Sequence, residues 1–328
     1  MEQTIRFCTA PDGARIAYAV SGKGPPIVKV GNWFTHLEYA RESPVWRHML
    51  EGLSEHRQLV SYDMRGTGLS DREVTDISFD RFVDDLAAVV DALELKRFPL
   101  FAISQGGAVS IAYTVQHPER VSHLIILGGY ARGGAHRKGE GPALVETNRA
   151  IIRQGWGSDD PSYRQMFGIQ FIPEGTPEQW KWFGELERVS ATPEIAEQIF
   201  MTINSVDIRG LLAQVKVPTL ILHCRGDRRV PYEMGCELAA HIPGARFVTL
   251  ASNNHLILEH EPATEVFFDE VAKFLGDKKP TSWKRAVRAT EGKLQSMARD
   301  VETSAAYKIF AMVAVVATMV TFIAWLLA

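Results

Sequence analysis

The sequence predicts an α/β protein with a mostly parallel central sheet, helices on both of its faces and a helical insertion. Three observations lead to this prediction. Short apolar runs of strand character alternate with amphipathic helical segments between about residues 26 and 127, which is the pattern of successive β-α-β units. A stretch of purely helical character follows, and the alternation resumes after Val217-Pro218. We therefore expect one sheet whose strands are interrupted once by helices.

The first part of the core, residues 1–130, opens with a hairpin signal, because two strand-like runs flank the turn Pro11-Asp12-Gly13. Apolar spacing at Phe82, Leu86 and Val89 predicts a helix over 79–93. The other expected elements are strands at 4–8, 14–20, 26–30, 58–62, 99–103 and 121–127, and helices at 44–56 and 106–116.

Residues 131–214 are expected to form a helical cap inserted between two strands. Most of its aromatic residues should pack between its own helices, and some should face the core beneath them. The second part of the core, residues 215–276, is predicted to contain strands at 219–224 and 245–250 and helices at 232–241 and 263–275. Both parts of the core then belong to the same sheet.

Residues 277–308 form a basic amphipathic linker, in which apolar residues such as Trp283, Leu294 and Val301 recur at roughly helical spacing. A stalk, a helix lying on anionic lipid and a short coiled-coil seam between two chains all fit this pattern. A solvated helical linker fits it equally well. The alternatives remain open from the sequence alone.

Residues 309–328 contain no charged residue and are almost wholly apolar. A helix of this length extends about 30 Å, the hydrocarbon thickness of a bilayer. Tyr307, Lys308 and Trp325 lie where interfacial anchors are expected. We predict a single-pass C-terminal transmembrane helix, with the folded domain facing the cytoplasm because the basic flank stays there. Small residues at four-residue spacing in the span would also permit a homodimer.

Ser104 is the candidate nucleophile, since it lies between a predicted strand and a predicted helix. A turn that exposes a serine at the carboxyl end of a sheet needs small residues two positions before and after it. Ala102 and Gly106 meet that need, although glycine is more usual at the first position. The same turn would direct the backbone N–H of Gln105 toward a reacting carbonyl group.

Two further residues complete the expected catalytic set, because a serine hydroxyl needs a base and the base needs an orienting carboxylate. Asp227 and His255 each follow a predicted strand of the second core part, in the order serine, acid, histidine. We assign Asp227 as the orienting acid and His255 as the general base. An ion pair with a neighbouring arginine is the alternative for Asp227, and His260 falls where a helix should begin.

The loop from Gly31 to Phe34 follows the third predicted strand and should supply a second oxyanion donor beside Gln105. The backbone N–H of Trp33 is the best candidate by position. The residues expected to contact substrate come from this loop and from the cap aromatics: Asn32, Phe34, Trp156, Phe167 and Trp182.

The segment Asp63-Met-Arg-Gly-Thr-Gly-Leu-Ser-Asp71, the turn at Ser104, Gly226-Asp227 and Asn254-His255 together resemble the α/β-hydrolase superfamily over about residues 4–275. Ile103-Ser-Gln-Gly-Gly-Ala-Val and His117-Pro-Glu-Arg-Val are similar to bacterial hydrolase domains that are sometimes fused to regulators or nucleotide cyclases. The resemblance implies the α/β-hydrolase fold, with the helical insertion as a cap over the active site. Epoxide hydrolases and haloalkane dehalogenases carry aspartate where this chain has Ser104, which disfavours both.

These residues predict a serine hydrolase that cleaves a carboxylic ester or related acyl substrate without a cofactor. The three cysteines have no CxxC spacing, so no metal site is expected, and a net charge of −3 gives no reason to expect nucleic acid. A lipid hydrolase or acyltransferase at the membrane surface is one alternative. A small-molecule sensor built on a hydrolase fold is the other.

Overall fold

The computed structural model describes residues 3–139, 141–158 and 160–281. The predicted transmembrane helix at 309–328 and the linker from residue 282 onward lie outside the described residues. Among the residues that are described, no helix is both long and apolar enough to span a bilayer.

The sheet has eight strands in the order β1-β2-β4-β3-β5-β6-β7-β8. Its strands are β1 (Gln3–Thr9), β2 (Arg15–Ser21), β3 (Pro26–Lys29), β4 (Gln58–Tyr62), β5 (Phe98–Ile103), β6 (Val121–Leu127), β7 (Thr219–Cys224) and β8 (Arg246–Leu250). β2 pairs antiparallel with β1 and β4, and the other pairings are parallel. The predicted mostly parallel sheet is therefore confirmed.

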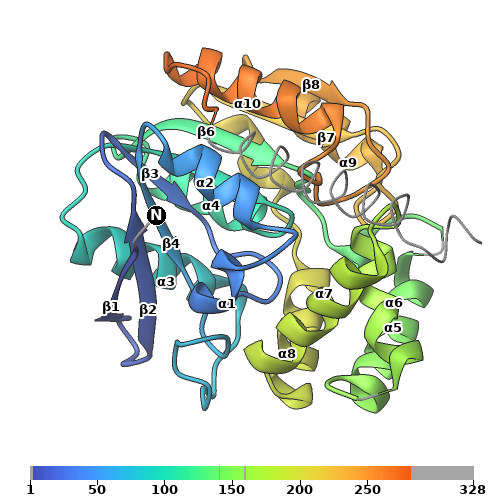
Figure 1. Ribbon diagram of the computed structural model, residues 1–328. Coiled ribbons are helices and arrows are strands. Elements are labelled where there is room, and N and C mark those ends of the chain that lie inside the picture. Colours follow the sequence, from blue (N-terminus) through green and yellow to red (C-terminus); the bar gives the residue numbers. More distant parts are fainter. Residues whose placement is uncertain (1–2, 140, 159, 282–328) are drawn as a thin grey trace, which may run out of the picture. The chain divides into compact units, whose positions relative to one another are not determined.

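Helices cover both faces of the sheet (Figure 1). They are α1 (Leu37–Arg41), α2 (Arg47–Ser54), α3 (Phe79–Ala92), α4 (Gly106–Gln116), α9 (Tyr232–His241) and α10 (Pro262–Leu275). β5 shows why both faces must be covered, since all six of its residues are buried. The Phe101 ring lies 5.5 Å from Phe267 of α10, and the Phe98 ring lies 6.4 Å from Tyr113 of α4.

Four helices fill the segment between β6 and β7: α5 (Gly141–Gly155), α6 (Pro161–Phe171), α7 (Pro177–Ser190) and α8 (Pro193–Ser205). They gather beside the sheet at the lower right of Figure 1. Local sequence explains two of the starts, because Thr176 and Thr192 cap α7 and α8 and a proline follows each of them. A 3-10 turn, Arg209–Gln214, leads back to β7.

The structure differs from the sequence prediction at the edges of elements. The helix expected at 44–56 spans Arg47–Ser54, and α1 was not predicted at all. With five residues, α1 is too short to show helical periodicity. It begins where the Leu37 N–H donates to the buried Asp63 carboxylate, which also accepts the N–H of Leu69.

The loop after β4 is held by a buried ion pair between Arg65 and Asp85, which are 1% and 0% exposed. The Arg65 guanidinium donates to both carboxylate oxygens of Asp85, and its Nη1 also donates to Asp12. This network ties the loop to α3 and to the β1–β2 turn.

Replacing Asp85 with asparagine should lower the free energy of unfolding by about 3 kcal/mol, because the buried Arg65 charge then keeps only the partly exposed Asp12 as its anionic partner. Urea unfolding followed by circular dichroism measures this loss. Asp207→Asn is the matched control, since it breaks the more exposed pair with Arg209 and should cost less than about 1 kcal/mol. Equal losses in the two variants would contradict the prediction.

Candidate active site

Ser104 lies at the turn between β5 and α4 in a strained conformation, with a φ of +56°. Positive φ is uncommon for a residue with a β-carbon and recurs at functional turns. The turn is tight because Gly106 packs against the 31–34 loop, where a β-carbon on Gly106 would lie 2.9 Å from the Gly31 carbonyl oxygen. The methyl group of Ala102 would lie 3.7 Å from the same β-carbon, which is an ordinary van der Waals distance, so alanine is tolerated at this position.

The structure brings Asp227 and His255 together, with 2.6 Å between Asp227 Oδ2 and His255 Nδ1. Both residues are buried. Asp227 Oδ1 accepts the backbone N–H groups of Arg229 and Val230, each at 2.9 Å. Burial opposes ionisation of Asp227, but the charge and hydrogen bond of His255, with the Val230 N–H, outweigh it and hold the pKa of Asp227 below its usual value.

His255 has a second ring nitrogen, Nε2, besides the one that contacts Asp227. This Nε2 is buried and has no hydrogen-bond partner among the described residues. Ser104 and His255 both line a small enclosed cavity. His260, the competing histidine, is exposed. The absence of a side chain at Gly128 is required here, because a β-carbon would lie 3.0 Å from the His255 ring.

The loop that carries His255 is fixed from two sides. Glu261, at the start of α10, accepts hydrogen bonds from Ser252 and Asn254 and from the backbone of Leu258. On the cap side, the His255 N–H donates to the carbonyl oxygen of Phe171 at the end of α6, over 2.8 Å. The position of the histidine therefore depends on the cap as well as on the core.

Two backbone N–H groups beside Ser104 are available as donors. Among the described residues, neither the Trp33 N–H nor the Gln105 N–H has a hydrogen-bond acceptor. The Trp33 side chain is held by the cap, since its indole N–H donates to Glu187 Oε1 on α7 over 3.2 Å. Burial raises the pKa of Glu187 to about 8, against the opposing effects of the Trp33 hydrogen bond and of Arg229.

The structure places only some of the predicted substrate contacts at the cavities that contain Ser104. Asn32 and Phe34 line the small cavity beside Ser104. Trp156 and Phe167 pack against Trp33, with ring centroids 6.3 Å and 5.9 Å away, and line none of the cavities at Ser104.

Trp182 is a clearer departure from the sequence prediction. Its ring stacks on Tyr39 of α1 at 5.1 Å, and it lines neither cavity at Ser104. The face of α7 that carries Trp182 is turned toward α1, whereas the face that carries Phe183 and Leu186 is turned toward the small cavity.

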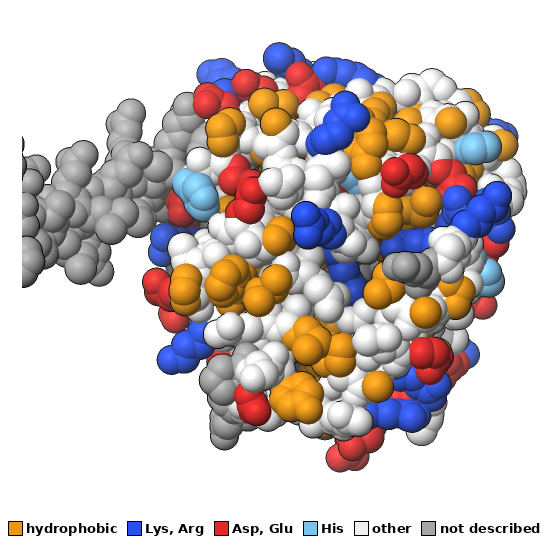
Figure 2. Space-filling model, turned by 90° about the vertical axis from the view of Figure 1, so that its right-hand side faces the viewer, with side chains coloured by type: hydrophobic (Ala, Val, Ile, Leu, Met, Phe, Trp, Pro, Cys, Tyr) orange, Lys and Arg blue, Asp and Glu red, His pale blue; other side chains and the backbone are white. Residues whose placement is uncertain are grey.

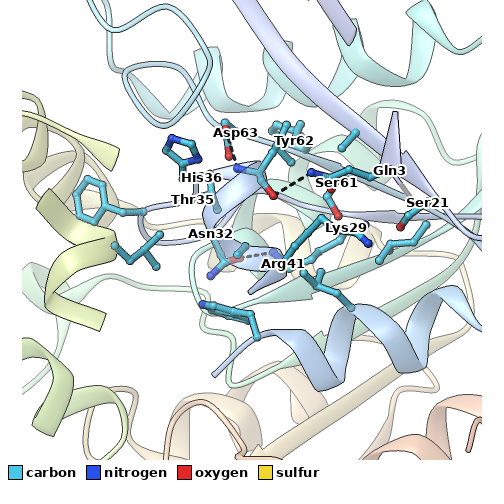
Figure 3. A pocket seen from close by; sticks show the side chains of 18 residues that line it. Gln3, Ser21, Lys29, Asn32, Thr35, His36, Arg41, Ser61, Tyr62 and Asp63 are labelled. Carbon is cyan, nitrogen blue, oxygen red and sulfur yellow. Dashed lines mark hydrogen bonds between the residues drawn. The ribbon is translucent and has the colours of Figure 1, made fainter. Parts of the chain in front are cut away.

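A separate cavity of about 50 Å³ lies beneath the 31–34 loop (Figure 3). Lys29 donates to Asn32 Oδ1 within it over 2.6 Å, and this hydrogen bond is drawn as a dashed line in the figure. Burial lowers the pKa of Lys29 to about 8, while the charge of Asp63 opposes the change. The side-chain oxygen of Asn32 thus accepts a hydrogen bond from Lys29, and this contact holds the 31–34 loop in place.

Sequence reasoning missed several residues that shape the site. Glu187 gave one signal, a charged residue on a helix face that otherwise carries Phe183 and Leu186. Glu261 gave none beyond its place before Pro262. Arg229 lies two residues after Asp227 in the sequence, but its position in the cavity depends on contacts with Gln170, Phe171 and Phe200 of the cap.

The raised pKa of Glu187 predicts a pH dependence of stability. The folded protein keeps this proton up to a pH of about 8, whereas the unfolded chain loses it near the ordinary value of 4.5. Between these values the folded state binds more protons, so rising pH favours unfolding, on the order of a few kcal/mol in total. Glu187→Gln keeps an oxygen acceptor for Trp33 and removes this effect.

Melting temperatures of the wild type and of Glu187→Gln, measured from pH 5 to pH 8.5, provide the test. The wild type should lose stability relative to the variant as pH rises to about 8, and the difference should then level off. Two parallel curves across this range would show that Glu187 ionises normally in the folded state.

Comparison with known proteins places this geometry in a family. A family model described as alpha/beta hydrolase fold matches residues 39–152. An AB hydrolase superfamily protein of Bacillus subtilis is 30% identical over 237 residues, which cover 71% of this chain and 86% of the relative. A pyrrolizixenacetamide deacetylase of Xenorhabdus hominickii is 24% identical over 271 residues, covering 80% and 95% of the two chains.

A further curated relative is a pimeloyl-[acyl-carrier protein] methyl ester esterase of Nitrosomonas europaea, 25% identical over 248 residues, which cover 74% of this chain and 93% of the relative. Among solved structures, an esterase from a Rhodococcus species superposes with a TM-score of 0.68 at 24% identity, covering 83% of this chain and 98% of the other. This last likeness concerns the fold alone. The sequence, the eight-stranded sheet and these relatives lead to one conclusion: the chain belongs to the alpha/beta hydrolase superfamily and is a hydrolase of that family.

Proposed function

We propose that the chain is a serine hydrolase that cleaves carboxylic esters, with Ser104, His255 and Asp227 as its catalytic residues. The observation that carries the proposal is the 2.6 Å contact between His255 and Asp227 beside Ser104 in its strained turn. This is the arrangement that activates a serine: a nucleophile, a base with one free nitrogen, and a carboxylate that fixes the tautomer of the base.

The mechanism follows from this arrangement. Ser104 Oγ attacks the ester carbonyl carbon while its proton moves to His255 Nε2, and the oxyanion is held by the N–H groups of Trp33 and Gln105. The bond to the alcohol breaks, and the alcohol leaves with the proton from His255. A water molecule then gives a proton to His255 and attacks the acyl carbon. The bond between the acyl carbon and Ser104 Oγ breaks, the acid is released, and the proton returns from His255 to Ser104 Oγ.

The names of the curated relatives support this choice of substrate. One relative is named a methyl ester esterase and another a deacetylase, and both are matched over most of their length. Each of these reactions is an acyl transfer to water. An ester is therefore the first substrate class to test on this chain.

Replacing Ser104 with alanine should reduce ester hydrolysis by at least about 10³-fold and abolish labelling by a fluorophosphonate, because the described residues that line the two cavities include no other serine, threonine or cysteine. Short p-nitrophenyl esters provide the assay. Ser110→Ala is the matched control, since Ser110 is a buried serine one turn further along α4 whose hydroxyl donates to the Gly107 carbonyl. It should keep its activity. A wild type that neither labels nor hydrolyses any ester would leave ligand sensing as the better account.

We also propose that residues 309–328 anchor the enzyme to a membrane, with the catalytic unit in the cytoplasm. The apolar composition of this segment and its basic flank support the proposal. Anchoring would suit lipid-soluble substrates, and a homodimer through the linker and span remains a prediction.

Cell fractionation tests the anchor. The full chain should sediment with membranes and resist extraction at high salt, whereas a chain that ends at Thr281, the limit of the first compact unit, should stay in the supernatant and keep its activity on soluble esters. A full chain found in the supernatant would rule the anchor out.

A further inference from the structure

A large cavity of about 490 Å³ opens beside Ser104 and has a one-sided charge. Its floor includes Ser104 and Gln105, and its walls come from the cap and from the loop after β7. Four basic residues line it, and none of the described residues that line it is acidic: Arg137, Lys138, Arg228 and Arg229. Figure 2 views the cap side of Figure 1 and shows Lys and Arg side chains (blue) in and around a hollow near the centre of that face.

Arg229 is the best-defined of these cations. Its guanidinium carbon lies 5.4, 4.9 and 5.8 Å from the ring centroids of three aromatic residues: Trp33, Phe171 and Phe200. Contacts of this kind orient a guanidinium and hold it in a weakly hydrated environment. Trp33 and Phe171 also line the small cavity at His255, so Arg229 is separated from the reacting centre by one layer of rings.

The charge of Arg229 is not compensated by the protein. Among the described residues, no carboxylate lies within ion-pair distance of it, and its guanidinium has one hydrogen-bond acceptor, Gln170 Oε1 at 3.1 Å. Arg65, which is fully buried, instead contacts the carboxylates of Asp85 and Asp12. Leaving a partly buried arginine without an anion is costly, which is the usual sign of a site that receives an anion from outside.

The nearest carboxyl groups do not fill this role. Asp227 is engaged with His255 and with two backbone N–H groups. The Glu187 carboxyl group is mostly protonated, and so uncharged, near neutral pH, since burial raises its pKa to about 8. Burial lowers the pKa of Arg229 itself to about 10, so its guanidinium stays charged at neutral pH.

Arg137 adds a second cation to the same cavity. Its guanidinium lies 5.0 Å from the Tyr130 ring, and Nη1 donates to the carbonyl oxygen of Arg229 over 3.4 Å. As with Arg229, no carboxylate among the described residues forms an ion pair with it. Two guanidinium groups on neighbouring segments therefore face the cavity beside the nucleophile.

We propose that this cavity binds a carboxylate group of the substrate, so that the preferred substrate is an ester that carries a second, free carboxylate, with Arg229 as the main contact. The proposal rests on the proposed function, since the ester bond must lie at Ser104. A guanidinium and a carboxylate match in planar, bidentate geometry. A neutral ester would leave Arg229 unpaired, and a cationic ester would meet like charge.

Two series of methyl esters and one cationic ester test the preference. The two series are the monomethyl and the dimethyl esters of the dicarboxylic acids from succinate to adipate, and the cationic ester is the methyl ester of a trimethylammonio-butyrate of matched length. At the best chain length, kcat/KM for the monomethyl ester should exceed that for the dimethyl ester by at least about 30-fold, the size expected when a desolvated charge pair forms or is lost. The cationic ester should be the poorest substrate of the three.

Arg229→Met keeps an unbranched apolar side chain among the three aromatic rings and removes the charge. It should lower the ratio of kcat/KM for the monomethyl ester to kcat/KM for the dimethyl ester to about one. Arg225→Met is the matched control, since Arg225 belongs to the same loop but packs on Tyr232 outside the cavity. Arg137→Met reports on the same cavity in case Arg229→Met does not fold.

The result that would overturn the inference is hydrolysis of dimethyl esters at least as efficient as that of monomethyl esters, with Arg229→Met and Arg137→Met changing neither. Binding separates this failure from a failure of the proposed function. Calorimetric titration of Ser104→Ala should show monomethyl glutarate binding at least about tenfold more tightly than dimethyl glutarate, and the added Arg229→Met change should abolish the difference. Binding preference without turnover would retain the subsite and refute the hydrolase.

Discussion

The turn at Ser104 is the constraint on which the rest of this site depends. Its positive φ places the serine side chain at the end of β5, and the close contact of Gly106 with the Gly31 carbonyl draws the 31–34 loop onto the start of α4. Trp33 and Gln105, the two proposed oxyanion donors, line the same cavity as Ser104. The strain stored in one residue is balanced by the packing of two strands and a helix around it.

The cap completes the site and does more than cover it. The end of α6 accepts the N–H of His255 through the Phe171 carbonyl, and α7 holds the Trp33 indole through Glu187. Both His255 and the 31–34 loop are therefore fixed by residues from a separate part of the sequence. A displacement of α6 or α7 would move His255 and the 31–34 loop, so in the proposed mechanism the cap influences the rate.

The environments of Arg65 and Arg229 show how the same residue type serves different ends. Arg65 is saturated by carboxylates, and its network holds a loop in place. Arg229 lies among aromatic rings with one amide oxygen as partner, at a cavity that contains the proposed nucleophile. Carboxylates of the protein neutralise the charge of Arg65, whereas the proposed partner of Arg229 is a carboxylate of the substrate.

The sequence by itself determined the sheet and the order of the proposed catalytic residues. β4, α4, β6, β7 and α9 begin and end at the predicted residues, because apolar periodicity and turn residues are local signals that adjacent positions carry. Ser104, Asp227 and His255 were identified in the same way, each from a short motif at the end of a strand. Only the tertiary structure decided which aromatic residues lie at the site. Trp182 stacks on Tyr39, whereas Phe171 and Phe200 contact Arg229. Helix orientation in the cap depends on contacts between distant segments. For the same reason, local sequence could not predict that Glu187 pairs with Trp33 or that Arg229 has no carboxylate partner among the described residues.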